Sequence, residues 1–234
     1  MNICTEWNDY ELGKIQIRTN NRAKRLVMRI LPECILMTVP PGTTQQVITD
    51  CINRHRIKLK KLREKCPDKH INLNYSIKNE LFQLTLSTGP VSRFMAKSSC
   101  GKMNIICPPE TDFNDEQLQT WLHKVIKESM RKNAQAQLPA RLQRLANQWG
   151  LTYDQVRINA SKGRWGSCST KKHINLSLNL LLLPSHLIDY VLLHELAHTI
   201  EMNHGQKFWN LLNKMTEQRA HQLQKELKNY HPKF

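Results

Sequence analysis

Residues 185–198 read SHLIDYVLLHELAH, and this stretch decides how the rest of the chain is interpreted. Its apolar residues recur at helical spacing, which predicts a largely buried helix with Ser185 as its N-cap. Within that helix, His194, Glu195 and His198 fit the pattern H-E-x-x-H. The pattern carries chemistry only on a helix, and the helical context is present here.

The spacing of the motif suits a metal ion. Residues i and i+4 share one helical face, so the imidazoles of His194 and His198 can reach one Zn²⁺ at about 2.0–2.1 Å. Glu195 is rotated by about 100° around the helix, which brings its carboxylate near the metal's open position rather than onto the metal. We therefore expect Glu195 to be the general base that takes a proton from a zinc-activated water and passes it to the leaving amine.

A third ligand is expected downstream of the motif. His204 follows at the spacing of the longer zincin pattern H-E-x-x-H-x-x-G-x-x-H, although Glu201 stands in place of the glycine. The sharp turn that this ligand needs is therefore expected nearer Asn203, because asparagine tolerates left-handed geometry. Two carboxylates farther along the chain, Glu217 and Glu226, are alternative third ligands.

The order of motifs along the chain resembles a known family. The series is RWGSCS (164–169), HINL (173–176), Leu183-Pro184, IDYV (188–191), the HELAH motif, Asn203-His204 and Phe208-Trp209. It resembles the YgjP-like metallopeptidase family, which is similar to the SprT-like proteins of the zincin superfamily. The upstream segments RAKRL (22–26) and Val39-Pro40 are also similar to the N-terminal region of that family.

This resemblance implies a zinc-dependent metallopeptidase with one Zn²⁺ per chain, held by His194, His198 and His204, with Glu195 as the base. It also implies that the strand over 164–169 lies beside the metal helix. In zincins such an edge strand commonly holds an extended substrate through backbone hydrogen bonds. The expected fold is α+β, a zincin-like unit of a small sheet and the HExxH helix, preceded by a β-rich N-terminal region.

Several neighbours of the motif are candidates for supporting roles. Tyr190, one turn before the motif, can hydrogen-bond a ligand, stabilise an oxyanion or simply pack against the sheet. Asp189 can orient a histidine, pair with Arg164 or favour the helix N-terminus through its charge. Arg164 and Ser167 lie on the candidate substrate strand. Cys168 is interpreted as a small buried residue rather than a nucleophile.

The pattern along the chain predicts two parts, 1–110 and 111–234. The first part contains short strand-like segments and one amphipathic helix, which is capped by Thr43 or Thr44 and ends at Pro67. The second part contains three strands and several helices. We expect a helix from residue 115, a new or kinked helical segment from residue 139, the metal helix, and one final amphipathic helix over 208–229.

The helix of the first part is strongly basic and is a candidate nucleic-acid contact. Its candidate residues are Arg54, Arg56, Lys58, Lys60, Lys61 and Arg63. The alternative interpretation is a solvated helix face, and no known nucleic-acid-binding motif accompanies the charges.

Composition narrows the class of protein. The 234 residues carry 35 Lys and Arg against 19 Asp and Glu, a formal net charge of +16, which favours acidic partners. No apolar run approaches the roughly 20 residues of a membrane helix, and the first residues do not resemble a secretory signal. The seven cysteines are odd in number and none are spaced as C-x-x-C, which indicates a reducing compartment.

The sequence therefore predicts a cytoplasmic zinc metallopeptidase that acts on peptides or proteins and does not bind membranes. Two alternatives stay open. One is a nucleic-acid-associated protein, including a DNA-associated protease, in which the basic helix over 54–65 supplies binding. The other is a metal-dependent hydrolase of non-peptide amides.

Overall fold

The structure is a computed structural model of the chain, and it describes residues 4–31, 34–64, 70–161 and 163–230. The chain divides into two compact units, an N-terminal unit of residues 1–69 and a C-terminal unit of residues 70–234. The expected α+β class is confirmed. The boundary expected near residue 110 lies inside the C-terminal unit, because the strands before it share a core with the helix after it.

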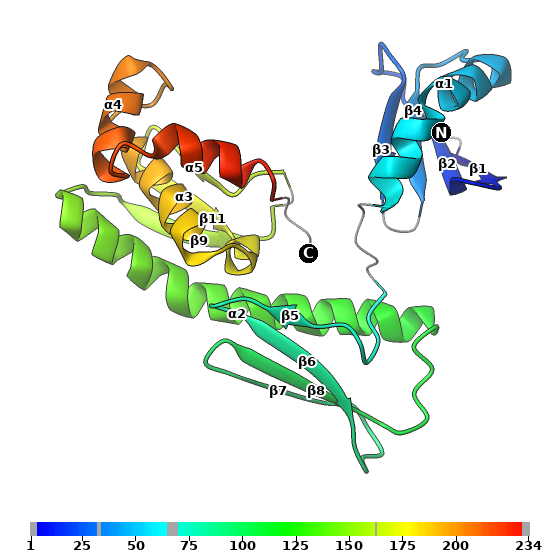
Figure 1. Ribbon diagram of the computed structural model, residues 1–234, viewed down its shortest axis with the longest axis horizontal. Helices are drawn as coiled ribbons and strands as arrows, with labels where there is room; N and C mark the ends of the chain where they lie inside the picture. Colours follow the sequence, from blue (N-terminus) through cyan, green and yellow to red (C-terminus); the bar gives the residue numbers. More distant parts are fainter. Residues whose placement is uncertain (1–3, 32–33, 65–69, 162, 231–234) are drawn as a thin grey trace. The chain divides into compact units, whose positions relative to one another are not determined.

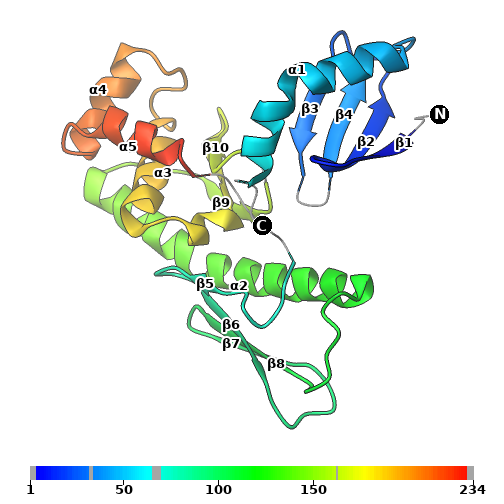
Figure 2. The same ribbon diagram turned by 45° about the vertical axis from the view of Figure 1, so that its right-hand side comes forward.

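The N-terminal unit is one sheet covered by one helix (Figures 1 and 2). Its elements are β1 (Cys4–Asp9), β2 (Gly13–Thr19), β3 (Val27–Ile30), β4 (Ile35–Val39) and α1 (Gln45–Glu64). The strand order is β1-β2-β4-β3, in which β2 and β4 run parallel and the other neighbours antiparallel. β1 was not expected, since its sequence CTEWND lacks a run of β-branched residues.

Alternation along the central strand builds the core of this unit. Ile35, Met37 and Val39 are buried while the residues between them are less so, and they pack with apolar residues of α1 such as Ile52. Thr44 caps α1 as expected, through its side-chain oxygen and the backbone N–H of Val47 at 3.5 Å. The expected end of this helix at Pro67 lies outside the described residues.

The C-terminal unit is organised along one long helix, α2 (Glu116–Trp149). Its other elements are β5 (Ile77–Lys78), β6 (Gln83–Thr88), β7 (Met95–Ser99), β8 (Lys102–Cys107), β9 (Gln155–Asn159), β10 (Gly166–Cys168), β11 (His173–Ser177), the 3₁₀ helix η1 (Leu178–Leu182), α3 (Ser185–Ala197), α4 (Gln206–Met215) and α5 (Ala220–Leu227). Figures 1 and 2 show the sheet of β5–β8 along one part of α2 and the remaining elements around its other end.

The helix α2 is one helix through Pro139, so no new helix begins there, and Figures 1 and 2 show that it bends along its length, as a kinked segment would. Asp115 caps its start by accepting a hydrogen bond from the backbone N–H of Gln117 at 2.8 Å, and Gly150 ends it at φ 62°. Proline inside a helix costs about 3 kcal/mol. The buried side chains of Leu138 and Leu142 on either side offset that cost by packing into the core.

The sheet of β5–β8 is fastened to α2 by polar contacts as well as by the shared core. Its strand order is β5-β6-β8-β7, with β6 and β8 parallel. The Asn133 side chain accepts a hydrogen bond from the backbone N–H of Gly101 at 2.9 Å, and the Ser129 and Ser98 hydroxyls lie 2.8 Å apart. These contacts explain why the strands before residue 110 belong to the C-terminal unit.

The second small sheet has the order β10-β11-β9, so β10 is an edge strand. The helix α3 follows this sheet and is buried over most of its length. Ser185, expected as the cap, is instead the first residue of α3 and makes no capping hydrogen bond, because Pro184 occupies the cap position. Among the described helices, none is both long and apolar enough to cross a membrane.

The single final helix expected over 208–229 is two helices, α4 and α5. The break falls at Glu217 and Gln218, which have left-handed φ angles of 52° and 63°. The Asn213 side chain stabilises this turn by accepting a hydrogen bond from the backbone N–H of Ala220 at 3.2 Å. Neither glycine nor proline marks the break, and so the helical periodicity concealed it.

Candidate metal centre and active site

Three histidines converge at the C-terminal end of α3. His194 and His198 lie one turn apart on the helix, and His204 returns from the segment that follows it. The Nε2 atom of His194 lies 3.2 Å from that of His198 and 3.1 Å from that of His204. Within the described residues these three form a cluster whose ligand atoms lie within 4.8 Å of one another.

The geometry of this cluster fits a tetrahedral metal. Bonds of about 2.0–2.1 Å at tetrahedral angles place neighbouring nitrogens about 3.3–3.4 Å apart, close to the separations found here. The Nδ1 atom of His198 lies 3.1 Å from the backbone oxygen of Glu201. Because that oxygen can only accept, Nδ1 carries the proton and the Nε2 lone pair of His198 is free to bind a metal.

Electrostatics also favours a cation at the cluster. Burial, followed by the neighbouring His198 and His204, lowers the pKa of His194 to about 3, so its imidazole is neutral at physiological pH. Burial likewise lowers the pKa of His198. The lowered pKa values of His194 and His198 favour neutral imidazoles, which are suited to a metal ion and unsuited to protons.

The turn between the second and third histidines differs from the expected one. No residue from 198 to 204 adopts a positive φ, so Asn203 does not provide a left-handed turn. Instead α3 tightens at its end, where Ile200 and Glu201 both donate backbone hydrogen bonds to the carbonyl of Ala197. The Thr199 hydroxyl also donates to a helix carbonyl at 2.7 Å. A turn built this way needs no glycine at position 201.

Phe208 forms a buried floor beneath the cluster. Its ring centroid lies 5.0 Å from that of His194, 4.6 Å from that of His198 and 4.7 Å from that of His204. The side chain is fully buried at the start of α4. In the sequence Phe208 is only one member of the ordered series of motifs, because local spacing does not indicate that it packs on all three histidines.

Glu195 is buried beside the histidines, and burial raises its pKa to about 8 despite the opposing charge of Arg164. Its Oε2 atom has no hydrogen-bond partner in the part of the chain that the structure describes. The Nδ1 atom of His194 is in the same condition. Unpartnered buried polar atoms are costly. The free Oε2 atom of Glu195 is available to a reacting group, whereas Nδ1 of His194 is on the other side of the ring from the metal-facing Nε2.

Gly166 is the residue that allows Glu195 to occupy this position. A Cβ added at Gly166 would lie 2.6 Å from Oε1 and 2.8 Å from Cδ of Glu195. The edge strand β10 therefore approaches the α3 carboxylate closely enough to exclude any side chain. In the sequence this glycine is part of the RWGSCS segment, where nothing indicates its contact with Glu195.

The other residues of β10 take different positions. Side chains alternate along a strand, so Ser167 faces away from the side on which its neighbours meet α3. Cys168 is half-buried, and burial together with the charge of Glu195 raises the pKa of its thiol to about 11. The thiol is therefore protonated at neutral pH, in line with a packing residue rather than a nucleophile.

Asp189 does not pair with Arg164, which was one of its expected roles. Its carboxylate receives two hydrogen bonds from Arg141 of α2, at 2.6 and 2.9 Å. Arg141 also donates to the backbone and side-chain oxygens of Ser185. This arginine, which sequence reasoning missed, ties α2 to the first turns of the metal helix. Arg164 is exposed at the mouth of the site.

Tyr190 is buried, and burial raises the pKa of its hydroxyl to about 12. Its ring centroid lies 6.1 Å from that of His194. The ring is shared by two cavities, one beside Glu195 and one on another side of α3. The side chain packs in the core of the C-terminal unit and also lines the cavity beside Glu195.

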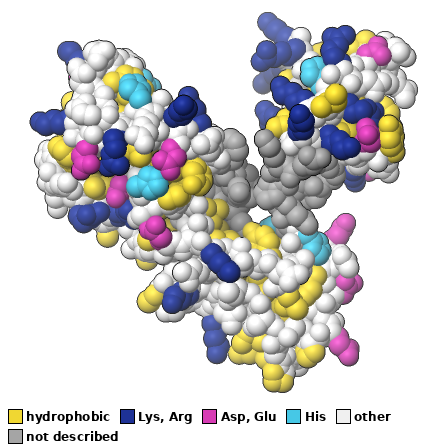
Figure 3. Space-filling view, in the orientation of Figure 1, with side chains coloured by type: hydrophobic (Ala, Val, Ile, Leu, Met, Phe, Trp, Pro, Cys, Tyr) yellow, Lys and Arg dark blue, Asp and Glu magenta, His cyan; other side chains and the backbone are white. Residues whose placement is uncertain are grey.

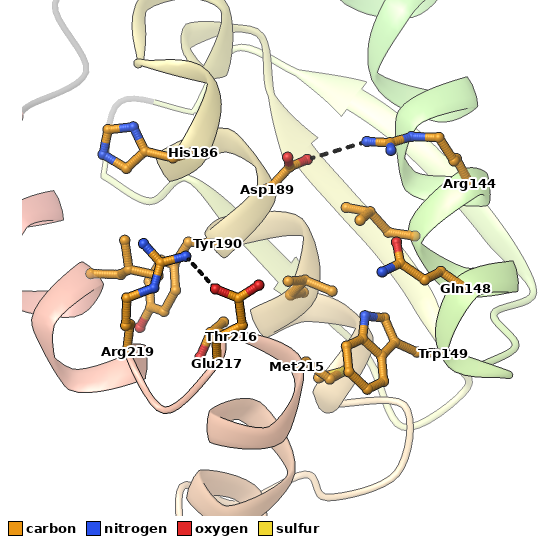
Figure 4. Close-up of a pocket in the computed structure, with 13 residues that line it drawn as sticks. Arg144, Gln148, Trp149, His186, Asp189, Tyr190, Met215, Thr216, Glu217 and Arg219 are labelled. Carbon is orange, nitrogen blue, oxygen red and sulfur yellow. Dashed lines mark hydrogen bonds and ion pairs between the residues drawn. The ribbon is translucent and has the colours of Figure 1, made fainter.

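The second of these cavities, shown in Figure 4, is lined by one of the two alternative third metal ligands. Glu217 lines it and pairs with Arg219 at 3.1 Å, and Asp189 lies across it at 4.0 Å from Arg144. The other alternative ligand, Glu226, pairs with His186 at 2.8 Å. Neither carboxylate belongs to the histidine cluster, which leaves His204 as the third member.

Comparison with known proteins identifies the family. The model of the YgjP-like metallopeptidase domain matches residues 24–230. The chain belongs to the YgjP-like metallopeptidase family. The family recognised from the motif series is thereby confirmed, together with a zincin-like metallopeptidase fold and the use of a metal ion.

One solved structure is similar in sequence over a limited region of this YgjP-like chain. It is described as the crystal structure of the metallopeptidase zymogen of Pyrococcus abyssi abylysin, with 26% identity. The similarity covers 39% of this chain and 92% of that one, at a TM-score of 0.36. No curated protein matches the chain.

The basic helix of this YgjP-like chain is less available than its sequence suggests. Arg56 makes two hydrogen bonds of 2.8 Å to the buried carboxylate of Asp9 and contacts Glu11 at 3.2 Å. Lys60 lies 3.8 Å from Glu11. Arg56 thus serves the fold of the N-terminal unit, whereas Lys60 keeps an exposed side chain.

Four further basic residues of α1 are candidate nucleic-acid contacts. Arg54, Lys58 and Lys61 are exposed, and the side chain of Arg63 lies outside the described residues. Figure 3 shows many Lys and Arg side chains on the visible face of the N-terminal unit. The exposed face of α1 is therefore basic. Its charges suit either a solvated helix face or a contact with an acidic partner.

Proposed function

We propose that this metallopeptidase is a zinc enzyme that hydrolyses peptide bonds, with His194, His198 and His204 as ligands and Glu195 as general base. The observation that carries the proposal is the meeting of three Nε2 atoms beside a buried carboxylate oxygen without a partner. Three protein ligands leave a fourth tetrahedral position open, which distinguishes catalytic from structural zinc sites. One Zn²⁺ per chain follows from this arrangement.

When bound, zinc supplies Lewis acidity, which lowers the pKa of water and polarises a carbonyl group. The chain itself supplies the orientation of the ligands. The Glu201 carbonyl fixes the tautomer of His198, and the Phe208 ring supports all three imidazoles from below. Because both contacts are made by backbone or buried groups, the ligands are held in place before a metal arrives.

Glu195 is suited to hold and transfer a proton. Its carboxyl group is buried, its Oε2 atom is free of other hydrogen bonds within the described residues, and its pKa is raised toward neutrality. A general base works best when its pKa lies near the operating pH. We infer that Oε2 accepts a proton from the attacking water and returns it to the leaving nitrogen.

The edge strand β10 offers a binding site for an extended peptide. It pairs with β11 on one side, and it contacts α3 beside Glu195. An extended substrate that adds to a sheet edge is held by backbone hydrogen bonds, whatever its sequence. Ser167 contributes to such binding through its backbone, and exposed Arg164 stands at the same end of the strand.

Elemental analysis of protein purified without chelators tests the proposal, combined with hydrolysis of denatured casein. We expect about one zinc per chain and cleavage that stops when a chelator removes the metal. A zinc-loaded protein that leaves casein intact but cleaves small acyl amides would instead favour the hydrolase of non-peptide amides. Absence of metal after reconstitution with zinc would overturn the proposal.

We place peptide hydrolysis ahead of nucleic-acid binding because of the contacts of the basic helix. Arg56 is engaged by carboxylates of its own unit, whereas Arg54, Lys58, Lys60 and Lys61 are exposed. A contact made by these four described side chains predicts only a modest dependence of DNA affinity on salt. A steep salt dependence without proteolysis would reverse this order. Location in the cytoplasm stays a prediction from the cysteine pattern.

A further inference from the structure

A cavity of about 260 Å³ opens directly beside the general base. Its lining comes from the segment of β10, from α3 and from α5, and comprises Arg164, Trp165, Gly166, Tyr190, Val191, His194, Glu195, Gln224 and Leu227. The reacting residues of the site thus form one wall of the cavity. Two residues of the C-terminal helix α5, Gln224 and Leu227, form another wall.

The chemistry of the lining is that of a side-chain pocket. Trp165, Tyr190, Val191 and Leu227 present most of the surface, which is apolar. Gln224 adds one neutral polar group, and Arg164 adds a positive charge on the side of the reacting His194 and Glu195. Small-molecule and cofactor sites usually occupy about 300–1,000 Å³. A smaller, mainly apolar cavity is therefore better matched to one amino-acid side chain than to a free ligand.

The position of the cavity links it to an extended peptide on β10. Side chains of such a peptide alternate between the two faces of the sheet, so every second one points toward α3. Because Gly166 carries no side chain, nothing from this part of the edge strand fills the space above Glu195. A substrate side chain adjacent to the cleaved bond can enter it.

We propose that this cavity binds a large apolar side chain next to the cleaved bond, and that Leu227 and Gln224 of α5 set which side chains fit. The proposal rests on the proposed peptidase function and names the substrate class for it. The helix α5 is held against α3 by the 2.8 Å contact between Glu226 and His186 and by buried Leu223, so its wall of the cavity is fixed.

The test compares the cleavage preferences of zinc-loaded full-length variants. A peptide library is digested, and mass spectrometry gives the residues on both sides of each cleaved bond. Leu227→Ala enlarges the cavity, and Gln224→Ala removes its polar wall while leaving a half-exposed surface position. Gln222→Ala on the same helix is the matched control, because Gln222 is exposed and does not line the cavity.

We expect wild-type protein to select Leu, Met or Phe at one position next to the cleaved bond. Leu227→Ala should raise the ratio of Trp and Phe to Leu at that position by about tenfold, which is typical when a pocket gains or loses methylene groups. Gln224→Ala should also change the profile, and Gln222→Ala should not. A profile without apolar selection, or identical profiles for wild type and both cavity variants, would overturn the proposal.

A binding measurement separates failure of this inference from failure of the peptidase function. In metal-free protein, the indole N–H signal of Trp165 is followed by NMR during titration with N-acetyl-phenylalaninamide and N-acetyl-glycinamide. A shift with the first compound only, altered by Leu227→Ala, supports the cavity even if no peptide is cleaved. Cleavage without any such shift leaves the peptidase function standing and overturns the assignment of the cavity.

Discussion

The Cα atom of Gly166 lies so close to Glu195 that an added Cβ would be 2.6 Å from its Oε1 atom. These residues are 29 positions apart, on the edge strand β10 and the metal helix α3. The carboxylate is buried, and α3 packs against the small sheet on this side. The position of the proposed base therefore depends on the absence of a side chain at residue 166.

Replacing Gly166 with alanine should thus impair hydrolysis without removing the metal. The added methyl group displaces the Glu195 carboxylate, and misplacement of a reacting group by about 1 Å can cost about 10²-fold in rate. Steady-state peptide hydrolysis and zinc content measure the two effects. Gly163→Ala is the control, because a Cβ at Gly163 has no atom within 4 Å. Equal activity of the two variants would contradict the assigned contact.

The third ligand can be tested against its two former rivals. We expect His204→Ala to lower zinc affinity by at least about 10-fold, because it removes one of three metal-facing nitrogens. Glu217→Ala and Glu226→Ala should keep wild-type zinc affinity, since these carboxylates pair with Arg219 and His186. Competition with a chromogenic chelator gives the affinities. Loss of zinc in a glutamate variant, with retention in His204→Ala, would reassign the site.

The attachment of the metal helix to α2 provides a prediction about stability. Asp189→Asn keeps the shape of the side chain but weakens two hydrogen bonds from Arg141. Hydrogen bonds to charged groups contribute about 1.5–3 kcal/mol, so the free energy of unfolding should fall by about that amount. Urea denaturation measures it. An unchanged midpoint would show that this contact does not hold α3 in place.

The N-terminal unit should lose stability in acid through Asp9. Arg56 holds the pKa of Asp9 at about 2, below the usual value near 3.9 for an unfolded chain. A depressed pKa contributes stability above about pH 4, and this contribution is lost as pH falls toward 2. Its size is on the order of 2 kcal/mol.

Comparison of wild type with Asp9→Asn isolates this effect from other carboxylates. The difference in free energy of unfolding should be largest near pH 6 and should close as the pH approaches 2. Urea unfolding at several pH values, with hydrogen exchange of peptides from α1, measures the difference in the N-terminal unit. A gap that does not change with pH would exclude the Asp9–Arg56 pair as its source.

The parts of the site that could be predicted from sequence are those set by local geometry. The one-turn spacing of His194 and His198 follows from the helical repeat, and His204 follows from a fixed offset along the chain. The metal helix itself was predictable because its apolar residues recur with helical periodicity. At these three histidines, the spacing along the chain is enough to indicate both their positions and their role as metal ligands.

Contacts between distant elements could not be predicted in the same way. Arg141 and Asp189 are 48 residues apart, and nothing in either segment marks the other as a partner. The sequence around Gly166 likewise contains no sign that Glu195 lies against it. Pairings of this kind depend on how α2, α3 and β10 pack, which periodicity alone does not determine.

Two features of the helices depend on tertiary packing more than on local preferences. They are the continuation of α2 through Pro139 and the turn at Glu217 that divides the expected final helix. A proline that would break an isolated helix is retained in α2 by buried leucines around it. A turn without glycine or proline is retained by the Asn213 side chain and the chain reversal between α4 and α5.

The most direct test of the account is the rate of casein peptide hydrolysis by Glu195→Gln relative to wild type, with both proteins carrying one zinc per chain. The substitution leaves the three histidines in place and removes the group that accepts a proton. General-base catalysis contributes about 10²–10⁴-fold, so we expect the rate to fall by at least about 100-fold while zinc is retained. A fully zinc-loaded variant with activity close to wild type would contradict the role assigned to Glu195.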